Sequence, residues 1–246
     1  MYKKKKIVAI ITARAGSKGV KNKNTKKLNG FPLISYSILS AKKSKLIDKV
    51  FVSTDGKKIS RISKTYGAEV INRPKKLSND VIHSDAAVVH AINYISKYLN
   101  FDFEYLVFIQ PTSPLRNKTE LDLAIKKCIE KKLDTVFSST DYKPFIWIKK
   151  RGKILPDNFN PKKRKRRQVN FNINETGSFY VVKKNSFLKN KDRFGKKVSN
   201  FDSDFYSAFE IDNIEEFKFI EKLLRHSVLK DYNLCLPKKN EVNQGN

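Results

Sequence analysis

Ile7-Val8-Ala9-Ile10-Ile11-Thr12 is an unbroken apolar run, and a polar loop containing Gly16 and Gly19 follows it directly. A run of this kind is typical of a strand that is buried on both faces of a parallel sheet. Short runs of similar character recur along the chain, at 50–53, 69–72, 105–110 and 135–139. We therefore interpret residues 7–12 as the first strand of a sheet to which these later segments also contribute.

Longer segments with helical spacing of apolar residues separate these strands, at 32–43, 57–66, 84–99 and 119–132. Strand alternating with helix predicts an α/β fold with a doubly wound, mostly parallel, Rossmann-like sheet. The carboxyl ends of parallel strands lie at one edge of such a sheet, where ligands bind. We therefore expect the functional residues in the loops that follow the strands.

The alternation changes after Ser139. Residues 140–170 are rich in Pro, Lys and Asn, and they include the only tryptophan, Trp147, in a segment typical of a hairpin strand. A strand is expected again at 177–183, where Gly-Ser-Phe-Tyr-Val-Val-Lys is strongly apolar. We interpret 140–170 as a small β-rich excursion from the sheet.

A last strand at 209–212 and a helix at 214–224 complete the expected elements. With 246 residues, 39% of them hydrophobic, the chain can bury the core of one large α/β domain. We interpret residues 1–230 as that domain. Residues 237–246 have no periodicity and are expected to form a loose C-terminal tail.

The sequence gives no sign of a membrane or secretory protein. No apolar run approaches the roughly 20 residues that are needed to span a bilayer. The apolar run after Lys6 is too short for a signal-peptide core, and Arg14 follows it with no small-residue cleavage site. Cys128 and Cys235 are isolated, so they predict neither a disulfide framework nor a metal cluster. We expect a cytoplasmic protein.

The formal net charge is +28, from 52 Lys and Arg against 24 Asp and Glu. Such an excess indicates a polyanionic partner, either a nucleic acid or a small anionic substrate. The abundance of Lys, Asn and Ile everywhere in the chain is also what an AT-rich coding bias produces. The densest basic run is 162–167, and most other lysines are dispersed. This distribution favours an anionic small molecule over nucleic acid.

The loop Arg14-Ala15-Gly16-Ser17-Lys18-Gly19 is the first candidate site, because it directly follows the first predicted strand. Its glycines permit tight turns and let backbone amides approach an anion, while Arg14, Lys18 and Lys23 add positive charge. The spacing matches neither a Walker A sequence nor a dinucleotide-binding GxGxxG. A polyphosphate site and a solvated basic turn are the two interpretations.

Three further polar segments follow predicted strands. Ser53-Thr54-Asp55 either faces a ligand or caps the next helix. Asn72-Arg73-Pro74 places a guanidinium where it either binds a base or phosphate or lies on the surface. In Gln110-Pro111-Thr112-Ser113-Pro114-Leu115-Arg116, two prolines stiffen a loop that holds polar side chains at the end of a strand. These segments are candidates for the remainder of the site.

Glu210 and Asp212 are separated by one residue, so on a strand they would share one face. Two neighbouring carboxylates repel each other unless a cation lies between them. Their hard oxygens suit Mg²⁺, which usually keeps water and substrate phosphates as its other ligands. An edge strand with solvated acids is the alternative. His83, His90 and His226 show no ligand spacing, and neither a Gly-x-Ser-x-Gly motif nor a Cys–His nucleophile is present.

In combination, these segments resemble the acylneuraminate cytidylyltransferase family, the CMP-sialic acid synthetases and their relatives. The most specific single match is the run Gln110 to Arg116. The resemblance covers nearly the whole chain, and its segments occur in order at 13–19 with 23–24, 33–38, 52–55, 66–70, 73–84, 110–116, 166–168, 177–180 and 211–212. It implies a fold of the nucleotide-diphospho-sugar transferase type.

The resemblance implies that CTP and a 2-keto sugar acid are the substrates. Its implied triphosphate site consists of Arg14, Gly16, Ser17, Lys18 and Lys23, with Arg14 and Lys23 also counted as catalytic. Its implied cytidine site consists of Asn24, Arg73, Asp80 and Ser84, and Arg73 would read the base.

On the side of the sugar acid, the resemblance implies contacts from Gln110, and Arg166 would meet a carboxylate or a phosphate. Glu210 and Asp212 would ligate Mg²⁺, with Asp212 also catalytic. The resemblance further implies a homodimer in which the excursion after Ser139 helps to close the partner's active site.

Two positions depart from the family pattern. Glu210-Ile211-Asp212 stands where the family commonly has Asp-Ile-Asp, and the longer side chain of Glu210 alters the metal geometry. Asn174-Glu175-Thr176-Gly177 stands where many members have an Arg-x-Asn-Gly run, and the missing guanidinium marks a different sugar acid.

The sequence therefore predicts a nucleotidyltransferase that moves CMP from CTP to the anomeric hydroxyl of a sialic-acid-like nonulosonic acid and releases pyrophosphate, for surface glycan synthesis. Three alternatives stay open. One is a cytidylyltransferase for an eight-carbon 3-deoxy-octulosonate-type acid. The others are a basic nucleic-acid-binding protein and an inactive relative that keeps the fold.

Overall fold

The computed structural model describes residues 2–78, 84–141, 144–163, 173–226 and 232–238 of the chain. Its main sheet has seven strands in the order β11-β7-β10-β6-β1-β4-β5. Their bounds are β1 Ile7–Thr12, β4 Lys49–Thr54, β5 Glu69–Asn72, β6 Tyr105–Ile109, β7 Thr135–Thr140, β10 Asn174–Lys183 and β11 Val198–Asp202. Neighbours are parallel except at β10, which is antiparallel to both β6 and β7. The prediction of a mostly parallel α/β sheet is confirmed.

The strand β1 lies in the interior of this sheet, as its sequence predicted. It pairs in parallel with β4 on one edge and β6 on the other, so that Ala9 lies between Val50 and Val107. Every side chain from Ile7 to Ile11 is fully buried. These registers also bring the carboxyl ends of the three strands to the same edge of the sheet.

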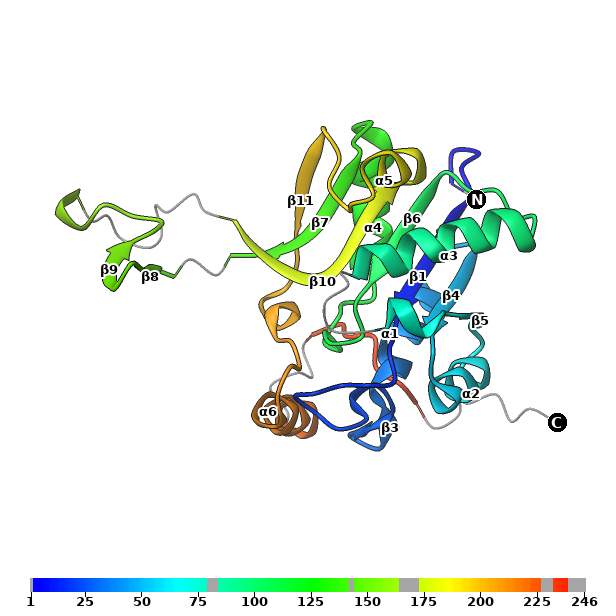
Figure 1. Cartoon of the computed structure of the whole chain (residues 1–246), viewed down its shortest axis with the longest axis horizontal. Helices are drawn as coiled ribbons and strands as arrows, with labels where there is room; N and C mark the ends of the chain where they lie inside the picture. Colours follow the sequence, from blue (N-terminus) through cyan, green and yellow to red (C-terminus); the bar gives the residue numbers. More distant parts are fainter. Residues whose placement is uncertain (1, 79–83, 142–143, 164–172, 227–231, 239–246) are drawn as a thin grey trace.

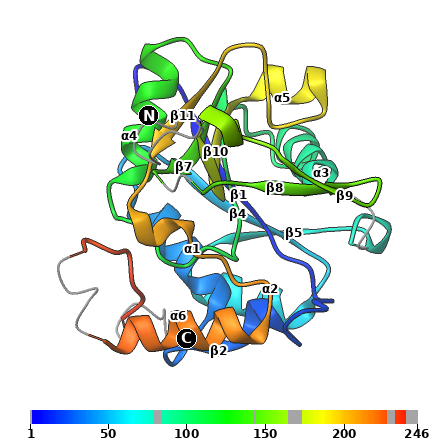
Figure 2. The same ribbon diagram turned by 90° about the vertical axis from the view of Figure 1, so that its left-hand side faces the viewer.

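Helices cover both faces of the sheet, so the fold is doubly wound (Figure 1). One face packs against α1 (Leu33–Lys43), α2 (Lys57–Thr65) and α4 (Glu120–Glu130). The other packs against α3 (Ser84–Tyr98) and α5 (Lys184–Asn190). Figure 2 shows α3 and α4 on opposite sides of the strands. Alternate residues of β1 enter the two apolar layers, as expected for a strand whose side chains point to opposite faces.

The helix α6 (Ile214–Arg225) belongs to a third apolar cluster, which joins it to the start of α1 and to the C-terminal segment. Ile211, just before the helix, and Leu234 are both buried in this cluster. The amide of Cys235 donates to the carbonyl oxygen of Arg116 at 2.8 Å, which ties the C-terminal segment to the body. Of the tail expected at 237–246, Pro237 is buried, and 239–246 lie outside the described residues.

The strand expected at 209–212 is not present, and this prediction was wrong. The segment is a loop between a short 3-10 helix, Phe205–Ala208, and α6. This loop is hydrogen-bonded to the loop after β6, where the Ile211 amide donates to the Thr112 carbonyl oxygen at 2.9 Å. The strand in this part of the chain is instead β11, which pairs with β7 at the edge of the sheet.

The predicted hairpin is present, as β8 (Trp147–Lys150) and β9 (Lys153–Pro156). Arg151 and Gly152 join the strands with φ values of +50° and +76°, as a two-residue hairpin turn requires. The hairpin extends away from the body of the molecule (Figure 1). Three shorter helices, Lys23–Thr25, Lys75–Leu77 and Pro161–Lys163, and the strand pair β2 (Lys27–Leu28) and β3 (Phe31–Pro32) complete the elements.

Arg116, the last residue of the Gln-Pro-Thr-Ser-Pro-Leu-Arg run, is fully buried. Its Nε donates to Ser178 Oγ at 3.1 Å, and its Nη2 donates to the carbonyl oxygens of Ser178 at 3.0 Å and Ser113 at 3.2 Å. This arginine therefore fixes the loop after β6 against the antiparallel strand β10.

Glu120, at the start of α4, is the buried acid near Arg116. Its Oε1 accepts hydrogen bonds from Ser207 Oγ at 3.0 Å and from the Asp204 amide at 3.2 Å. Burial raises the pKa of Glu120 to about 7, against the opposing attraction of Arg116.

No helix among the described residues is long and apolar enough to span a membrane.

Because the neutral form of Glu120 is favoured in the folded protein, its stabilising effect is present at acidic pH and is lost as the pH rises through about 7. We expect the unfolding free energy of the wild type to fall relative to Glu120→Gln between pH 4.5 and pH 7, by at most about 3 kcal/mol. Urea titrations at a series of pH values measure this difference. Glu215→Gln, at an exposed position, is the control. A constant difference between wild type and Glu120→Gln across this range would contradict the assignment.

Candidate active site

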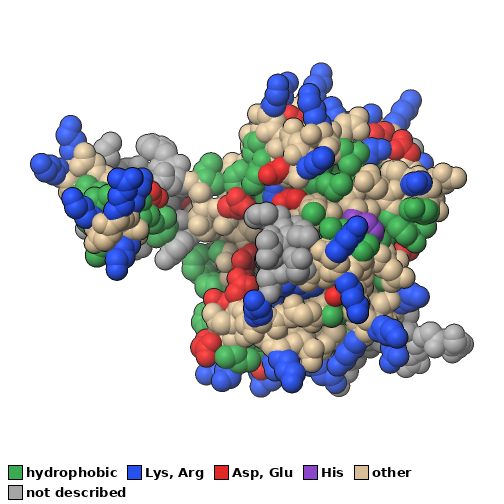
Figure 3. Space-filling view, in the orientation of Figure 1, with side chains coloured by type: hydrophobic (Ala, Val, Ile, Leu, Met, Phe, Trp, Pro, Cys, Tyr) green, Lys and Arg blue, Asp and Glu red, His purple; other side chains and the backbone are tan. Residues whose placement is uncertain are grey.

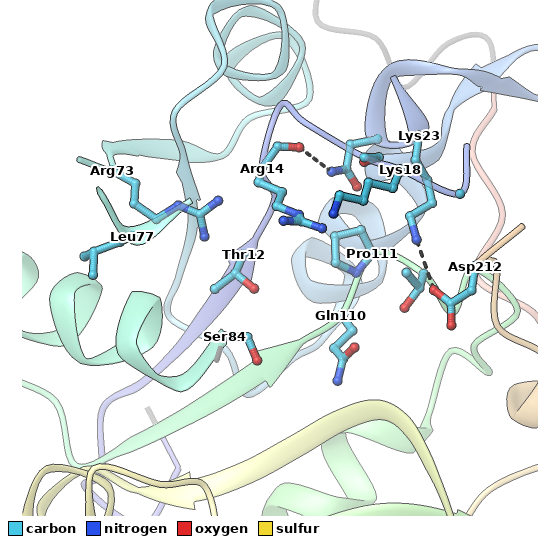
Figure 4. Close-up of a pocket in the computed structure, with 14 residues that line it drawn as sticks. Thr12, Arg14, Lys18, Lys23, Arg73, Leu77, Ser84, Gln110, Pro111 and Asp212 are labelled. Atoms are coloured by element: carbon cyan, nitrogen blue, oxygen red, sulfur yellow. Dashed lines mark hydrogen bonds and ion pairs between the residues drawn. The ribbon is translucent and has the colours of Figure 1, made fainter. Parts of the chain in front are cut away.

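A cavity of about 480 Å³ opens at the carboxyl ends of β1, β5 and β6 (Figure 4). The residues that line it are Thr12, Arg14, Ser17, Lys18, Gly19, Lys23, Asn24, Arg73, Leu77, Ser84, Gln110, Pro111, Thr112 and Asp212. Most of the predicted site residues are therefore brought together at one place. Gly16 and Glu210 are not among the lining residues, and Asp80 and Arg166 lie outside the described residues.

The loop after β1 is held by hydrogen bonds to its backbone. Asn24 is buried, and its Nδ2 donates to the carbonyl oxygen of Arg14 at 3.0 Å. The amide of Ala15 donates to Asp55 Oδ1 at 2.9 Å. Asp55, which the sequence left as either a ligand contact or a helix cap, thus anchors the loop. The side chains of Arg14 and Lys18 remain directed at the cavity, as Figure 4 shows.

Arg73 follows β5 and is 8% exposed, so the alternative of a surface arginine does not hold. Its amide donates to the Thr54 carbonyl oxygen at 2.8 Å. Its Nη2 lies 3.8 Å from Asp55 Oδ1, which is an ion-pair distance but too long for a hydrogen bond. Burial lowers the pKa of Arg73, and Asp55 opposes this shift. Among the described residues Asp55 is the one carboxylate at ion-pair distance from this buried guanidinium, which leaves donors over for a ligand.

Those donors are Nε and Nη2, which are buried and have no hydrogen-bond partner among the described residues. Leaving buried polar groups unpaired costs free energy, so such groups are rare in folded proteins unless a ligand, water or ion satisfies them. Arg73 lines the cavity, so a ligand in the cavity is the natural partner.

The opposite side of the cavity carries the acidic residues. Lys23 Nζ donates to the Ile211 carbonyl oxygen at 2.8 Å and to Asp212 Oδ1 at 3.1 Å. Gly19 packs directly on this segment, since a Cβ added to it would lie 1.8 Å from the Asp212 carbonyl oxygen. The basic loop and the acidic segment therefore meet through Lys23 and Gly19.

Glu210 lies beside this point, with Ser113 Oγ donating to its Oε1 at 3.2 Å. Burial, and then the negative charge of Asp212, raise the pKa of Glu210 to about 7. Although the strand expected here is absent, Glu210 and Asp212 are therefore close enough to repel each other. No group of three or more Asp, Glu, His or Cys side chains suited to a metal occurs among the described residues. Any cation between these two carboxylates would need oxygens from a substrate or water.

Gln110 stands at the end of β6, with its amide donating to the Ser178 carbonyl oxygen at 3.2 Å. Across from it, Gly177 has φ +67°, and a Cβ there would lie 2.4 Å from Glu210 Oε1 and 3.6 Å from Gln110 Nε2. A glycine at this position therefore leaves room for the longer acidic side chain of Glu210. Gly177 was expected only as the start of a strand, and its closeness to Glu210 depends on the tertiary structure.

Thr12, Gly19, Leu77, Pro111 and Thr112 line the cavity although the sequence analysis assigned none of them an individual role there. All five lie in segments that the sequence analysis quoted, so their place in those segments was the available signal. Leu77 lies in the 3-10 helix after Arg73 and provides an apolar surface. The cavity thus combines four cationic side chains, amide and hydroxyl groups, and a small apolar patch.

Comparison with known proteins places this chain in a family. The cytidylyltransferase family profile matches residues 8–240. The N-acylneuraminate cytidylyltransferase of Escherichia coli O18:K1:H7 is 31% identical over 218 residues, which are 87% of this chain and 51% of that protein. The CMP-N,N'-diacetyllegionaminic acid synthase of Campylobacter jejuni is 30% identical, over 89% of this chain and 94% of that protein.

A solved structure of CMP:2-keto-3-deoxy-manno-octonic acid synthetase complexed with CTP shares the fold, with a TM-score of 0.65 and 13% identity. The alignment covers 89% of this chain and 98% of that one. The doubly wound fold is therefore shared with that protein. From the match over nearly its whole length, the chain belongs to the cytidylyltransferase family.

Proposed function

We propose that this chain transfers CMP from CTP to the anomeric hydroxyl of a sialic-acid-like nonulosonic acid and releases pyrophosphate. The observation that carries the proposal is a cavity lined by Arg14, Lys18, Lys23 and the buried, unsatisfied Arg73. Such a set suits a triphosphate at one end and a polar base at the other. The relatives that act on N-acylneuraminate and on diacetyllegionaminic acid support a nine-carbon acid as the acceptor.

In the proposed reaction, the anomeric oxygen of the acid attacks the α-phosphorus of CTP. The bond from that phosphorus to the oxygen bridging it to the β-phosphate breaks, and pyrophosphate leaves with the electron pair. The protein contributes mainly by positioning the reactants and neutralising charge. Arg14, Ser17, Lys18 and Lys23 would hold the triphosphate, with the backbone at Gly16 close to it.

The same proposal assigns the nucleoside and the acceptor to the other lining residues. Asn24, Arg73 and Ser84 would bind cytidine, and Gln110 would contact the sugar acid. Arg73 can offer its free donors to acceptor atoms of the base. Asp80 and Arg166 keep the roles expected from the resemblance, as nucleotide and sugar-acid contacts.

Glu210 and Asp212 fit a magnesium ion, which we include in the proposal. Burial, and after it the negative charge of Asp212, raises the pKa of Glu210 to about 7, and a cation bound beside the two carboxylates would favour their charged forms. A protein that supplies only two carboxylates suits Mg²⁺, which commonly takes its remaining ligands from phosphates and water. When bound, the ion supplies neutralisation of phosphate charge.

We further propose a homodimer that forms through the hairpin of β8 and β9. Trp147 is 52% exposed and Ile154 is 69% exposed, although both are large apolar side chains. Phe159 packs against Trp147 with ring centroids 5.2 Å apart, which gives the hairpin a small aromatic base. An apolar surface on an extended hairpin is the kind of feature that an interface covers.

Nucleic-acid binding has less support. On the face shown in Figure 3, the Lys and Arg side chains are scattered over the body and the hairpin. Surfaces that bind nucleic acid gather such side chains into one patch or stripe. The dispersed surface charge and the cationic lining of the cavity favour a small anionic substrate.

Pyrophosphate release reports the proposed reaction directly. With CTP and Mg²⁺ we expect pyrophosphate release when a nine-carbon 2-keto acid is present, and not with ATP, GTP or UTP. A panel of sialic, legionaminic and pseudaminic acids, with an eight-carbon 3-deoxy-octulosonate, identifies the acceptor. Release with the eight-carbon acid alone would contradict the proposed substrate class.

Replacing Asp212, the more exposed of the two carboxylates, tests the metal site. We expect Asp212→Asn to lower kcat by about 100-fold or more and to shift the Mg²⁺ titration to higher concentration, because one hard oxygen ligand is lost. Asp102→Asn is the matched control, since Asp102 is exposed and pairs with Lys184 instead. An Asp212→Asn enzyme with an unchanged magnesium titration would count against the site.

The contact between Gly19 and Asp212 predicts a steric effect. In Gly19→Ala the new Cβ must displace the Asp212 backbone, and a shift of about 1 Å at such a site can lower the rate 100-fold. We expect kcat/KM for CTP to fall by at least about tenfold while the protein remains folded. Gly30→Ala, at an exposed turn with open space around the new Cβ and a φ of +89°, is the control for backbone strain alone. Equal activity losses in the two variants would rule out a specific contact.

The proposed dimer predicts a mass of twice 28.5 kDa by light scattering at micromolar concentration. The double variant Trp147→Glu/Ile154→Glu should shift the population to monomer, because it would bury two charges at the interface. Tyr98→Glu is the matched control, since Tyr98 is 67% exposed on α3. A wild-type protein that is monomeric and fully active would refute the dimer.

A further inference from the structure

Ser84 is the only residue of the cavity wall supplied by α3 among the described residues, and it stands at the start of that helix. Arg193 does not line the cavity, but its side chain reaches Ser84 from the loop after α5. Its Nη2 donates to Ser84 Oγ at 2.8 Å. The sequence analysis did not single out Arg193, and the proposed mechanism does not use it.

The Arg193 guanidinium is held on its edge and on its faces. Its Nε and Nη2 donate to the two carboxylate oxygens of Asp85 at 3.0 Å and 2.9 Å. Its Cζ lies 4.5 Å from the ring centroid of Tyr180 and 4.9 Å from that of Phe108. A bidentate pair with stacked aromatic rings fixes both the position and the plane of a guanidinium.

The partners of Arg193 connect it to the elements that build the site. Phe108 lies in β6, two residues before Gln110, and its ring centroid is 5.7 Å from that of Tyr180 in β10. The Tyr180 hydroxyl donates to Glu175, near the start of β10. A continuous set of contacts therefore runs from the strand that follows the hairpin excursion to the mouth of the cavity.

The backbone around Arg193 is also anchored. Thr135 Oγ1 donates to the Arg193 carbonyl oxygen at 2.6 Å, and the Gly195 amide donates to the same hydroxyl at 3.2 Å. A Cβ at Gly195 would lie 2.3 Å from the Asp134 Cβ, so this loop packs closely on the start of β7. The arginine thus projects from a fixed loop rather than from an open one.

The chemistry of these contacts determines the direction of the Ser84 hydroxyl. A serine hydroxyl has one proton to donate and two lone pairs that accept, whereas a guanidinium only donates. Because Arg193 occupies one lone pair, the Ser84 proton must point away from Arg193. Ser84 lines the cavity, so that proton is available to a ligand there.

We propose that Arg193 is a positioning residue that fixes the Ser84 hydroxyl as a hydrogen-bond donor into the cavity. The ligand group that it would recognise is an acceptor atom of the nucleotide, such as the carbonyl oxygen or the unprotonated ring nitrogen of cytosine. This inference rests on the proposed binding of CTP. It adds that Arg193, a residue outside the nucleotide site, makes the Ser84 hydroxyl a hydrogen-bond donor in the wall of that site.

A purely structural role makes a different prediction. If Arg193 only stabilised the junction of α3, β10 and the loop, its substitution would lower stability without any dependence on the Ser84 hydroxyl. If Arg193 acts through Ser84, removing either side chain should lose the same hydrogen bond to CTP. The double variant should then bind CTP no more weakly than the variant that lacks only the Ser84 hydroxyl.

The test is calorimetric measurement of CTP binding to the full chain, without sugar acid, for wild type, Ser84→Ala, Arg193→Lys and the double variant. Lysine can still neutralise Asp85, but it lacks the fork that reaches Ser84. We expect about tenfold weaker binding for each single variant, the value of one lost hydrogen bond, and no further loss in the double variant. Arg225→Lys, at an exposed ion pair with Glu221, is the matched control.

Losses that multiply in the double variant, or an Arg193→Lys protein that is folded and binds CTP like the wild type, would overturn the inference. Urea midpoints report whether each variant is folded.

If Arg193→Lys does not fold, Asp85→Asn tests the same contact, because the neutral amide releases the guanidinium from its bidentate position. The loss for Asp85→Asn should likewise vanish in a Ser84→Ala background, and a loss that persists there overturns the inference. Absence of CTP binding by the wild type would instead refute the proposed function.

Discussion

Burial of β1 on both faces and both edges is the constraint on which the rest of the structure depends. Its hydrogen bonds to β4 and β6 leave no free edge, and its alternating side chains fill two separate apolar layers. Because β1, β4 and β6 are parallel, all three end in a loop at the same edge of the sheet. The basic loop after β1 and the loop after β6 are therefore neighbours, although about a hundred residues separate them in the sequence.

The site is built around a division of charge. Arg14, Lys18 and Arg73 face one part of the cavity, and Asp212 and Glu210 lie at its other side, with Lys23 between them. Asp55 maintains this division without lining the cavity, because it holds the amide of Ala15 and lies beside Arg73. A phosphate-binding loop that is held by its backbone keeps its side chains and remaining amides for an anion.

The antiparallel strand β10 connects the parts of the site that come from distant segments. Ser178 binds the buried Arg116 and fixes the loop after β6, while Gly177 leaves room for Glu210 beside Gln110. Tyr180 stacks against Phe108 and Arg193. Of the departures from the expected family pattern, Asn174 lies at the start of this strand and Glu210 lies beside its Gly177.

The sequence by itself determined the elements whose signal is local. Apolar runs predicted β1, β4, β5, β6 and β7, and helical spacing predicted the intervening helices. Polar residues at strand ends, together with the family resemblance, predicted most of the described cavity wall. Only the tertiary structure decided that 209–212 is a loop, that β11 forms the sheet edge, and that β10 runs antiparallel. It also decided the partners of Arg73, Arg116 and Arg193, because the fate of a charged side chain depends on what distant segments place around it. A local pattern reports whether a segment is buried, whereas pairing direction and electrostatic partners are properties of the assembled chain.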